Sequence, residues 1–167
     1  MAVNPKKSIE HSALADIGTV AARKRRGAAR LPGVHAGSMS AFGGDTTDVI
    51  ARMRTGTPAR AVPDIAVRFG ISQDRLLDLL RLPKSTVKGR ISTDGKLSST
   101  EQDRVYRAER VLERALQVLE DEGAAKAWLT RANRSLGGEV PLALLDTEVG
   151  YELVLDTLGR IEYGVVS

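Results

Sequence analysis

Apolar residues in the second half of the chain recur at intervals of three and four, the spacing of one buried face of a helix. The clearest series predicts a long helix over about 99–121, which begins after the capping-box pair Ser98 and Glu101. Its apolar positions are Val105, Ala108, Leu112, Ala115 and Leu119. This face either packs into the core of the chain or enters a coiled coil, and we expect core packing.

Two shorter helices with a tight turn between them are predicted before the long helix. Ser72 is a good N-cap residue, and the apolar residues after it lie at helical spacing up to Arg81. These residues are Leu76, Leu77 and Leu80. Pro83 cannot extend that helix and suits the start of the next one, over 84–90, which is short and basic.

Other segments also have helical patterns. Residues 46–70 predict one or two helices, broken at 56–58 by a Gly-Thr-Pro sequence. Gly123 is expected to end the long helix, because glycine is common just past a helix C-terminus. The shorter helix after it carries Trp128, which we expect to pack in the core rather than to form an interface contact.

A final helix is predicted between Thr147, a suitable cap, and Gly164. A loop at Gly137 and Gly138 and a helical turn opened by Pro141 lead into it. Its expected buried stripe consists of Val149, Leu153, Val154, Leu158 and Ile161. No segment shows strand alternation of useful length, so the predicted fold class is all-α.

Charge is distributed unevenly along the 167 residues, whose 25 Lys and Arg and 21 Asp and Glu give a net charge of +4. Residues 1–40 carry +5, residues 41–100 carry +4, and residues 101–167 carry −5. A basic front and an acidic back indicate two surfaces with different partners. The basic part suits a polyanion such as nucleic acid, because side chains that neutralise phosphates release counterions.

These patterns divide the chain into a flexible basic tail over 1–45, a region over 46–100 that holds the two short helices, and a helical C-terminal region over 101–167. The tail is rich in Gly, Ala, Ser and Arg and has no sustained period. Its basic run over 23–26 either is solvated or makes accessory contacts with DNA phosphates.

Composition argues against most site chemistries. The chain has no Cys, and His11 and His35 both fall in the tail, so metal sites and Ser-His-Asp triads are not expected. Phosphate-loop, dinucleotide and zinc-protease motifs are missing, so we expect no enzyme, no cofactor and no metal. No apolar run reaches the roughly 18 residues of a membrane span, and no signal peptide is apparent, which favours a cytoplasmic protein without a membrane partner.

Residues 72–91 carry the strongest local motif, which is a helix, a short turn and a short basic helix. The motif resembles a helix-turn-helix DNA reader, and an ordinary helical hairpin is the alternative. As a reader, the second helix would present its outer face to bases and phosphates of the major groove. The candidate DNA-binding residues are Lys84, Ser85, Thr86, Lys88 and Arg90. Arg81 stands where many such turns have Gly, and Leu77 stands where they favour Ala.

A second series of residues recurs in a characteristic order over 115–164. It consists of Ala115, Ala127-Trp128-Leu129, Asn133, Leu136-Gly137-Gly138, Pro141-Leu142, Leu144-Leu145, Thr147-Glu148, Gly150, Leu158 and Arg160-Ile161-Glu162-Tyr163-Gly164. In this order the series resembles the Xre/ParS/MbcA family of antitoxins, the DNA-binding partners of RES-domain toxins in type II toxin–antitoxin systems. Ala132 is a departure, because the family commonly has Pro before this Asn. With the helix-turn-helix, the resemblance covers about residues 60–167.

The resemblance implies an Xre-like helix-turn-helix domain followed by a small helical domain that binds a toxin and dimerises. It implies that this second domain blocks the NAD-binding active site of a RES-domain toxin, an ADP-ribosyltransferase or NAD-degrading enzyme. It also implies binding to the promoter DNA of its own operon, and a homodimer within a toxin–antitoxin hetero-oligomer. The alternative is a stand-alone helix-turn-helix transcriptional regulator without a toxin partner.

The candidate toxin-binding residues lie in the loop after residue 132 and at the end of the chain. They are Asn133, Leu136, Gly137, Arg160, Glu162, Tyr163 and Gly164. The terminal segment is the candidate plug for the toxin's active site, because it has a polar tip and a helix behind it. Tyr163 either belongs to this plug or covers the core of its own chain. Gly137 and Gly138 either form a simple turn or contact the toxin.

Overall fold

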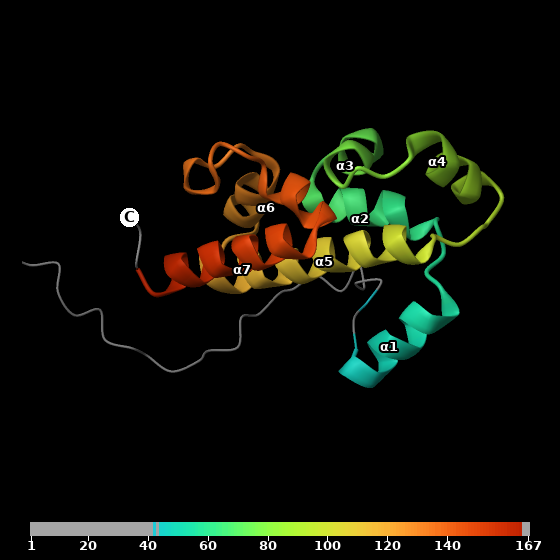
Figure 1. The fold of residues 1–167 in the computed structure, drawn as a ribbon, viewed down its shortest axis with the longest axis horizontal. Helices are drawn as coiled ribbons and strands as arrows, with labels where there is room; N and C mark the ends of the chain where they lie inside the picture. The colour runs from blue at the N-terminus through green and yellow to red at the C-terminus, as the bar shows by residue number, and fades with distance from the viewer. Residues whose placement is uncertain (1–41, 43, 165–167) are drawn as a thin grey trace, which may run out of the picture. The chain divides into compact units, whose positions relative to one another are not determined.

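The computed structural model describes residue 42 and residues 44–164. The elements in this part of the chain are α1 (Thr46–Thr55), α2 (Ala61–Phe69), α3 (Gln73–Leu79), α4 (Lys84–Ser92), α5 (Ser99–Leu119), α6 (Glu122–Thr130), the 3₁₀ turns η1 (Arg134–Leu136) and η2 (Pro141–Asp146), and α7 (Glu148–Glu162) (Figure 1). Apart from an isolated bridge between Pro58 and Lys96, these residues form no β structure. The all-α prediction is confirmed.

Several predictions fall outside the described residues. These are the basic run over 23–26, His11, His35 and nearly all of the predicted tail. The division of the remainder into regions 46–100 and 101–167 stays a prediction.

The long helix α5 begins and ends through side chains close to its own termini. The Ser98 hydroxyl accepts from the backbone N–H of Glu101, and the Glu101 carboxylate accepts from the backbone N–H of Ser98 at 2.7 Å, so the predicted capping box is present. The predicted stop at Gly123 is wrong. Glu120 adopts the left-handed conformation (φ 55°), and Asp121 caps α6 by accepting from Ala124 N–H at 2.6 Å. Gly123 therefore lies inside α6.

Two buried polar side chains of α5 hold the helices that precede it. Gln102 donates to the carbonyl of Met53 at 2.8 Å and accepts from the backbone N–H of Thr57 at 2.7 Å, which fixes the predicted break between α1 and α2. Two helical turns further along α5, Glu109 is almost fully buried and pairs with Arg68 of α2. Both groups are satisfied, as buried polar groups must be.

One apolar cluster runs through the whole described fold, because α5 contributes to it along most of its length. The members from before α5 include Val62, Ile65, Phe69, Leu76, Leu77, Leu80 and Val87. The members from α5 onward include Val105, Ala108, Val111, Leu112, Ala115, Leu129, Leu142, Leu145, Val154 and Leu158. Trp128 packs against this cluster but is only partly buried. The face of α5 therefore packs into the core of its own chain, as expected.

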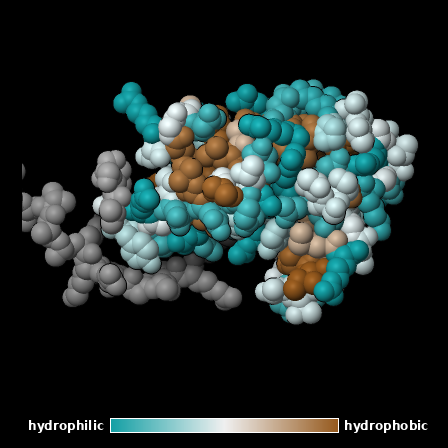
Figure 2. Space-filling model, in the orientation of Figure 1, coloured by the Kyte–Doolittle hydropathy of each residue, from teal (hydrophilic) through white to brown (hydrophobic). Residues whose placement is uncertain are grey.

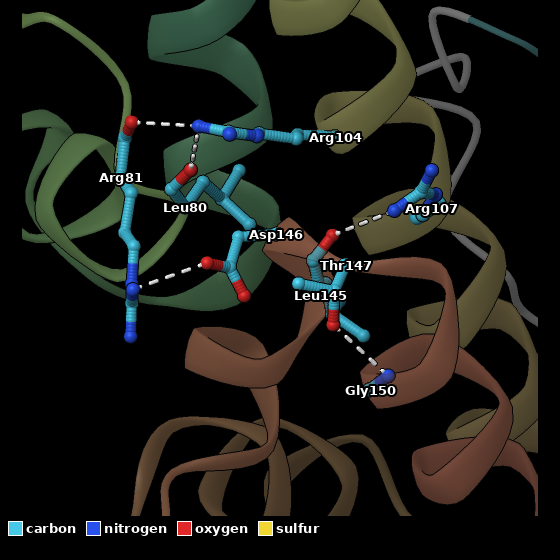
Figure 3. Close-up of polar contacts among 8 residues, drawn as sticks. All are labelled: Leu80, Arg81, Arg104, Arg107, Leu145, Asp146, Thr147 and Gly150. Atoms are coloured by element: carbon cyan, nitrogen blue, oxygen red, sulfur yellow. Dashed lines mark hydrogen bonds and ion pairs between the residues drawn. The ribbon is translucent and has the colours of Figure 1, made fainter.

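The start of α7 lies unusually close to η2. Thr147 caps α7 by accepting from Gly150 N–H at 3.1 Å (Figure 3). A Cβ atom at Gly150 would stand 1.9 Å from the carbonyl oxygen of Leu144, far inside contact distance. Only glycine fits here without a backbone shift, and its face of α7 is buried.

This close approach corrects the predicted stripe of α7. Val149 is 76% exposed and Leu153 is 42% exposed, although both were expected to be buried. The buried residues of α7 are Gly150, Val154, Thr157 and Leu158. Apolar residues of α7 occupy a wider arc than one buried face, and the close contact at Gly150 decides which part of the arc faces inward.

Candidate functional site

The α3–turn–α4 segment has the geometry of a helix-turn-helix. The Ser72 hydroxyl accepts from Arg75 N–H at 3.2 Å and starts α3, and Pro83 stands directly before α4. The residues that fix the crossing of the two helices are all buried: Leu76, Leu77, Leu80, Leu82 and Val87. With this inner face locked, the outer face of α4 is left for a partner.

The turn between α3 and α4 uses a strained backbone that α5 supports. Arg81 has φ 50°, a left-handed conformation that costs a non-glycine residue about 1–2 kcal/mol. This explains why glycine is usual here. Arg104 of α5 donates to the carbonyl of Arg81 at 2.8 Å and to that of Leu80 at 3.4 Å (Figure 3). The guanidinium of Arg81 lies 3.2 Å from the carboxylate of Asp146 in η2.

The predicted DNA-binding lysines of α4 have acidic partners on α3. The ammonium of Lys84 lies 2.6 Å from a carboxylate oxygen of Asp78, and that of Lys88 lies 2.6 Å from one of Asp74. The hydrogen bond from Lys88 lowers the pKa of Asp74 below its ordinary value, with further coulombic help from both lysines. These pairs were not predicted from the sequence, although two acids one turn apart opposite two lysines one turn apart were a usable signal.

The other candidates on α4 differ in whether their side chains are engaged within the chain. Ser85 and Thr86 are exposed near its N-terminus. Arg90 instead points back to α5, where its guanidinium pairs with the mostly buried carboxylate of Glu101. The same carboxylate completes the capping box, so Arg90 ties the end of α4 to the start of α5. A contact between Arg90 and DNA stays a prediction.

In the loop after α6, the candidate residues mostly organise the loop itself. The side chain of Asn133 accepts from Ser135 N–H at 2.9 Å, and its backbone exchanges hydrogen bonds with Glu139 and Gly138. Leu136 is buried. Gly137 is exposed and has φ 68°, so it forms the turn and is also open to a partner.

At the end of α7, all four candidates are exposed, and two of them also make contacts within the chain. The carboxylate of Glu162 pairs with Arg114 of α5, and Gly164 donates to the carbonyl of Ile161 at 3.2 Å. Arg160 is exposed, and Tyr163 is 80% exposed. Tyr163 therefore does not cover the core of its own chain.

The exposed pair Val149 and Leu153 forms an apolar stripe along the first half of α7. Figure 2 shows apolar surface gathered over the region of α6 and α7. Exposed Glu148, Glu152 and Asp156 flank the stripe on the same helix. Helical spacing predicted that both residues belong to the core, so the stripe was not among the candidate sites.

A shallow groove of about 250 Å³ lies between α5 and α7. It is lined by Arg110, Glu113, Arg114, Gln117, Tyr151 and Leu155. Burial raises the pKa of Tyr151 above its ordinary value. Within residues 42 and 44–164, no cluster of His, Asp or Glu could hold a metal ion, and none of the helices there is long and apolar enough to span a membrane.

Comparisons with known proteins match both halves of the described chain. Residues 48–110 match the model of the antitoxin Xre-like helix-turn-helix domain. Residues 114–164 match the model of the antitoxin Xre/MbcA/ParS C-terminal toxin-binding domain. These are binding domains and not catalytic ones, in agreement with the prediction that the chain is no enzyme.

Three curated relatives extend this similarity. An antitoxin Xre from Yersinia enterocolitica is 29% identical over 122 residues, which is 72% of this chain and 82% of that protein. An antitoxin Xre from Photorhabdus laumondii is 36% identical over 94 residues, 54% of this chain and 64% of that protein, so less than two thirds of its length is spanned. A protein of Sphingobium sp. named Prs ADP-ribosylating antitoxin is 24% identical over 129 residues, 72% of this chain and 81% of its own length.

Proposed function

This chain belongs to the Xre/MbcA/ParS family of antitoxins, and from this premise we propose that it neutralises a RES-domain toxin by occupying the toxin's NAD-binding active site. Inhibition of this kind needs shape and exclusion of substrate but no catalytic group on the antitoxin. The name of the Sphingobium relative associates ADP-ribosylation with that protein and supports the choice of toxin chemistry. The toxin would be an ADP-ribosyltransferase or an NAD-degrading enzyme.

The observation that carries the proposal is the exposed stripe of Val149 and Leu153 inside the matched toxin-binding domain. Full burial of such side chains is worth roughly 1.5–3 kcal/mol each, so a partner that covers both would gain affinity from them. The acidic residues beside it favour a toxin surface that is apolar at its centre and basic at its rim. The stripe would dock the toxin, and the end of α7 would reach its active site.

The candidate residues divide between contact and support in this proposal. Exposed Arg160, Tyr163 and Gly137 would contact the toxin. The remaining candidates would act by holding these contacts in place, because their own groups are engaged within the chain. They are Asn133, Leu136, Glu162 and Gly164.

We also propose that the helix-turn-helix represses the chain's own operon in the cytoplasm. Ser85 and Thr86 would contact bases or phosphates, with Lys84 and Lys88 as the cationic contacts. Arg90, the remaining candidate, would act by holding α4 in place through its pair with Glu101. A homodimer within a toxin–antitoxin hetero-oligomer would present two copies of α4 to two half-sites one helical turn apart.

Co-expression with a RES-domain protein encoded beside this chain tests the first proposal. We expect the two proteins to co-purify, and we expect NAD consumption by the toxin to stop at a stoichiometric amount of this chain. Undiminished NAD consumption together with no association would defeat the proposal. A chain that binds its promoter but has no such neighbour would instead be a stand-alone transcriptional regulator.

A further inference from the structure

The DNA-facing helix α4 carries a two-rung ladder of ion pairs to α3. Asp74 and Asp78 stand one helical turn apart on α3, and Lys84 and Lys88 stand one turn apart on α4. The pairs Asp78–Lys84 and Asp74–Lys88 both have nitrogen–oxygen distances of 2.6 Å. All four side chains remain about half exposed, so each rung borders the surface that would meet DNA.

The ladder is not needed to hold α3 against α4. Exposed ion pairs of this kind add little to folding stability, because water and salt screen them. The crossing is already fixed by fully buried side chains, among them Leu76, Leu80 and Val87. The larger consequence of the ladder is therefore for the charge that α4 presents outward.

Sequence-independent attraction to DNA comes from cations that neutralise phosphates and release counterions. A lysine in contact with a carboxylate offers little net charge to a phosphate. If the lysine moves to a phosphate, an uncompensated carboxylate is left beside the DNA backbone. Contacts of the two α4 lysines with phosphates alone therefore add little to the free energy of DNA binding.

We infer that Asp74 and Asp78 determine specificity by suppressing the binding of α4 to DNA of arbitrary sequence. This inference rests on the proposed DNA-binding function of the helix-turn-helix. At a cognate site, base-edge acceptors such as guanine O6 and N7 compensate the lysines for the ion pairs that they give up. Ser85 and Thr86 add further contacts there. Phosphates of other sequences do not, so the ladder widens the difference between operator and random DNA.

The test uses the full chain with Asp74→Asn and Asp78→Asn combined, and measures affinity for its own promoter and for a scrambled duplex over a range of salt. Affinity for scrambled DNA should rise roughly tenfold near 0.1 M salt, and its log–log salt slope should steepen by up to about 1.8. Affinity for the promoter should rise less, so the specificity ratio should fall. Each single substitution should give about half the change in slope.

The matched control combines Asp64→Asn with Glu139→Gln, which makes the same change in net charge. Both carboxylates are exposed and have no ion pair within the described part of the chain. This control should change scrambled-DNA binding much less. Adding Lys84→Ala and Lys88→Ala to the ladder variant should abolish its gain, because the gain depends on the released lysines.

A ladder variant whose affinity and salt slope on scrambled DNA equal those of the control would overturn the inference, as would a gain that persists without the lysines. Thermal unfolding of each variant separates these results from misfolding. If the unmodified chain does not prefer its promoter, the proposed autoregulation fails. The comparison on scrambled DNA still tests the two carboxylates in that case.

Discussion

The outer faces of α4 and α7 are both exposed, yet they are built in opposite ways. On α4 the lysines are compensated by carboxylates of the neighbouring helix. On α7 two apolar side chains, Val149 and Leu153, have no cover in the described chain. The ion pairs of α4 limit its binding to DNA of arbitrary sequence, which uncompensated lysines would favour. The arrangement on α7 leaves apolar area for one protein partner to bury.

These two faces are supported by the same helix. Arg104 of α5 binds the turn before α4, and Arg107 of α5 donates to the carbonyl of Leu145 at 3.3 Å and pairs with Glu148 at the start of α7 (Figure 3). One core and one supporting helix thus present two surfaces whose side chains do not overlap. Substitutions should therefore separate the two interactions.

The largest effect is expected from Gly150→Ala. The new methyl group would meet the carbonyl of Leu144, so α7 must shift, at a cost of about 3 kcal/mol. Urea unfolding measures this loss, which should also weaken toxin binding. Gly159→Ala is the matched control, because a Cβ atom there meets nothing within 4 Å and should stabilise α7 by about 0.5–1 kcal/mol. Equal effects of the two substitutions would contradict the close approach at Gly150.

Val149→Asp and Leu153→Asp should break the α7 surface alone. We expect each to lower toxin affinity by about 2 kcal/mol, or roughly 30-fold, because a charge replaces an apolar anchor. Titration calorimetry with the toxin measures this effect, and promoter affinity should not change. Val67→Asp on α2, where the side chain is 73% exposed, is the control and should leave both interactions intact. Parallel loss of promoter binding would mean that the surfaces are not independent.

Arg90→Ala and Lys88→Ala should separate support from contact within α4. Loss of Arg90 leaves the mostly buried Glu101 without its cation and should cost about 1–2 kcal/mol in thermal or urea unfolding. Loss of Lys88 should leave stability almost unchanged but weaken promoter binding by about 1 kcal/mol, because it removes a base contact of α4. The reverse pattern would show that Arg90 is the contact and Lys88 the support.

Arg81→Gly and Arg81→Ala isolate the strain in the helix-turn-helix turn. Both lose the ion pair with Asp146, but only glycine accepts φ 50° without strain. The glycine variant should therefore be more stable than the alanine variant by about 1 kcal/mol, a difference of several degrees in Tm. If alanine were equally stable, the turn would not hold its left-handed conformation.

The smallest effect concerns the ionisation of Asp74. Its pKa is lowered in the folded chain, so its contribution to stability is present above the ordinary value of 3.8 and is lost as pH falls through the lower folded value. Lys88→Ala removes the main cause and should move this pKa back up, which carboxyl NMR titration measures. Lys96→Ala, whose ammonium donates to the carbonyl of Thr55, should leave it unchanged.

Much of the fold was predictable because its signals are local. Ser72, Pro83 and the Ser98–Glu101 pair start their helices through contacts within a few residues, so the sequence alone indicates them. The buried leucines of α3 likewise follow from helical spacing. The structure agrees with the sequence at each of these positions.

The candidate surfaces were harder to predict because they depend on contacts between distant segments. Val149 and Leu153 are exposed only because Gly150 brings another face of α7 against η2. Similarly, the spacing of basic residues on α4 predicts an exposed face, but it does not reveal that Arg90 has a carboxylate partner on α5. Helical periodicity gives the width of an apolar arc and not its orientation.

The hydrogen bonds from Arg104 to two carbonyls of the turn limit how a different helix-turn-helix could be grafted onto this antitoxin. A transplanted cassette must bring not only its own recognition helix but also a turn whose peptide oxygens meet that guanidinium. An exchange of residues 72–91 should therefore give a folded protein only if the new segment has the same backbone conformation at residues 80 and 81. The residues proposed to contact DNA are the replaceable part of the module.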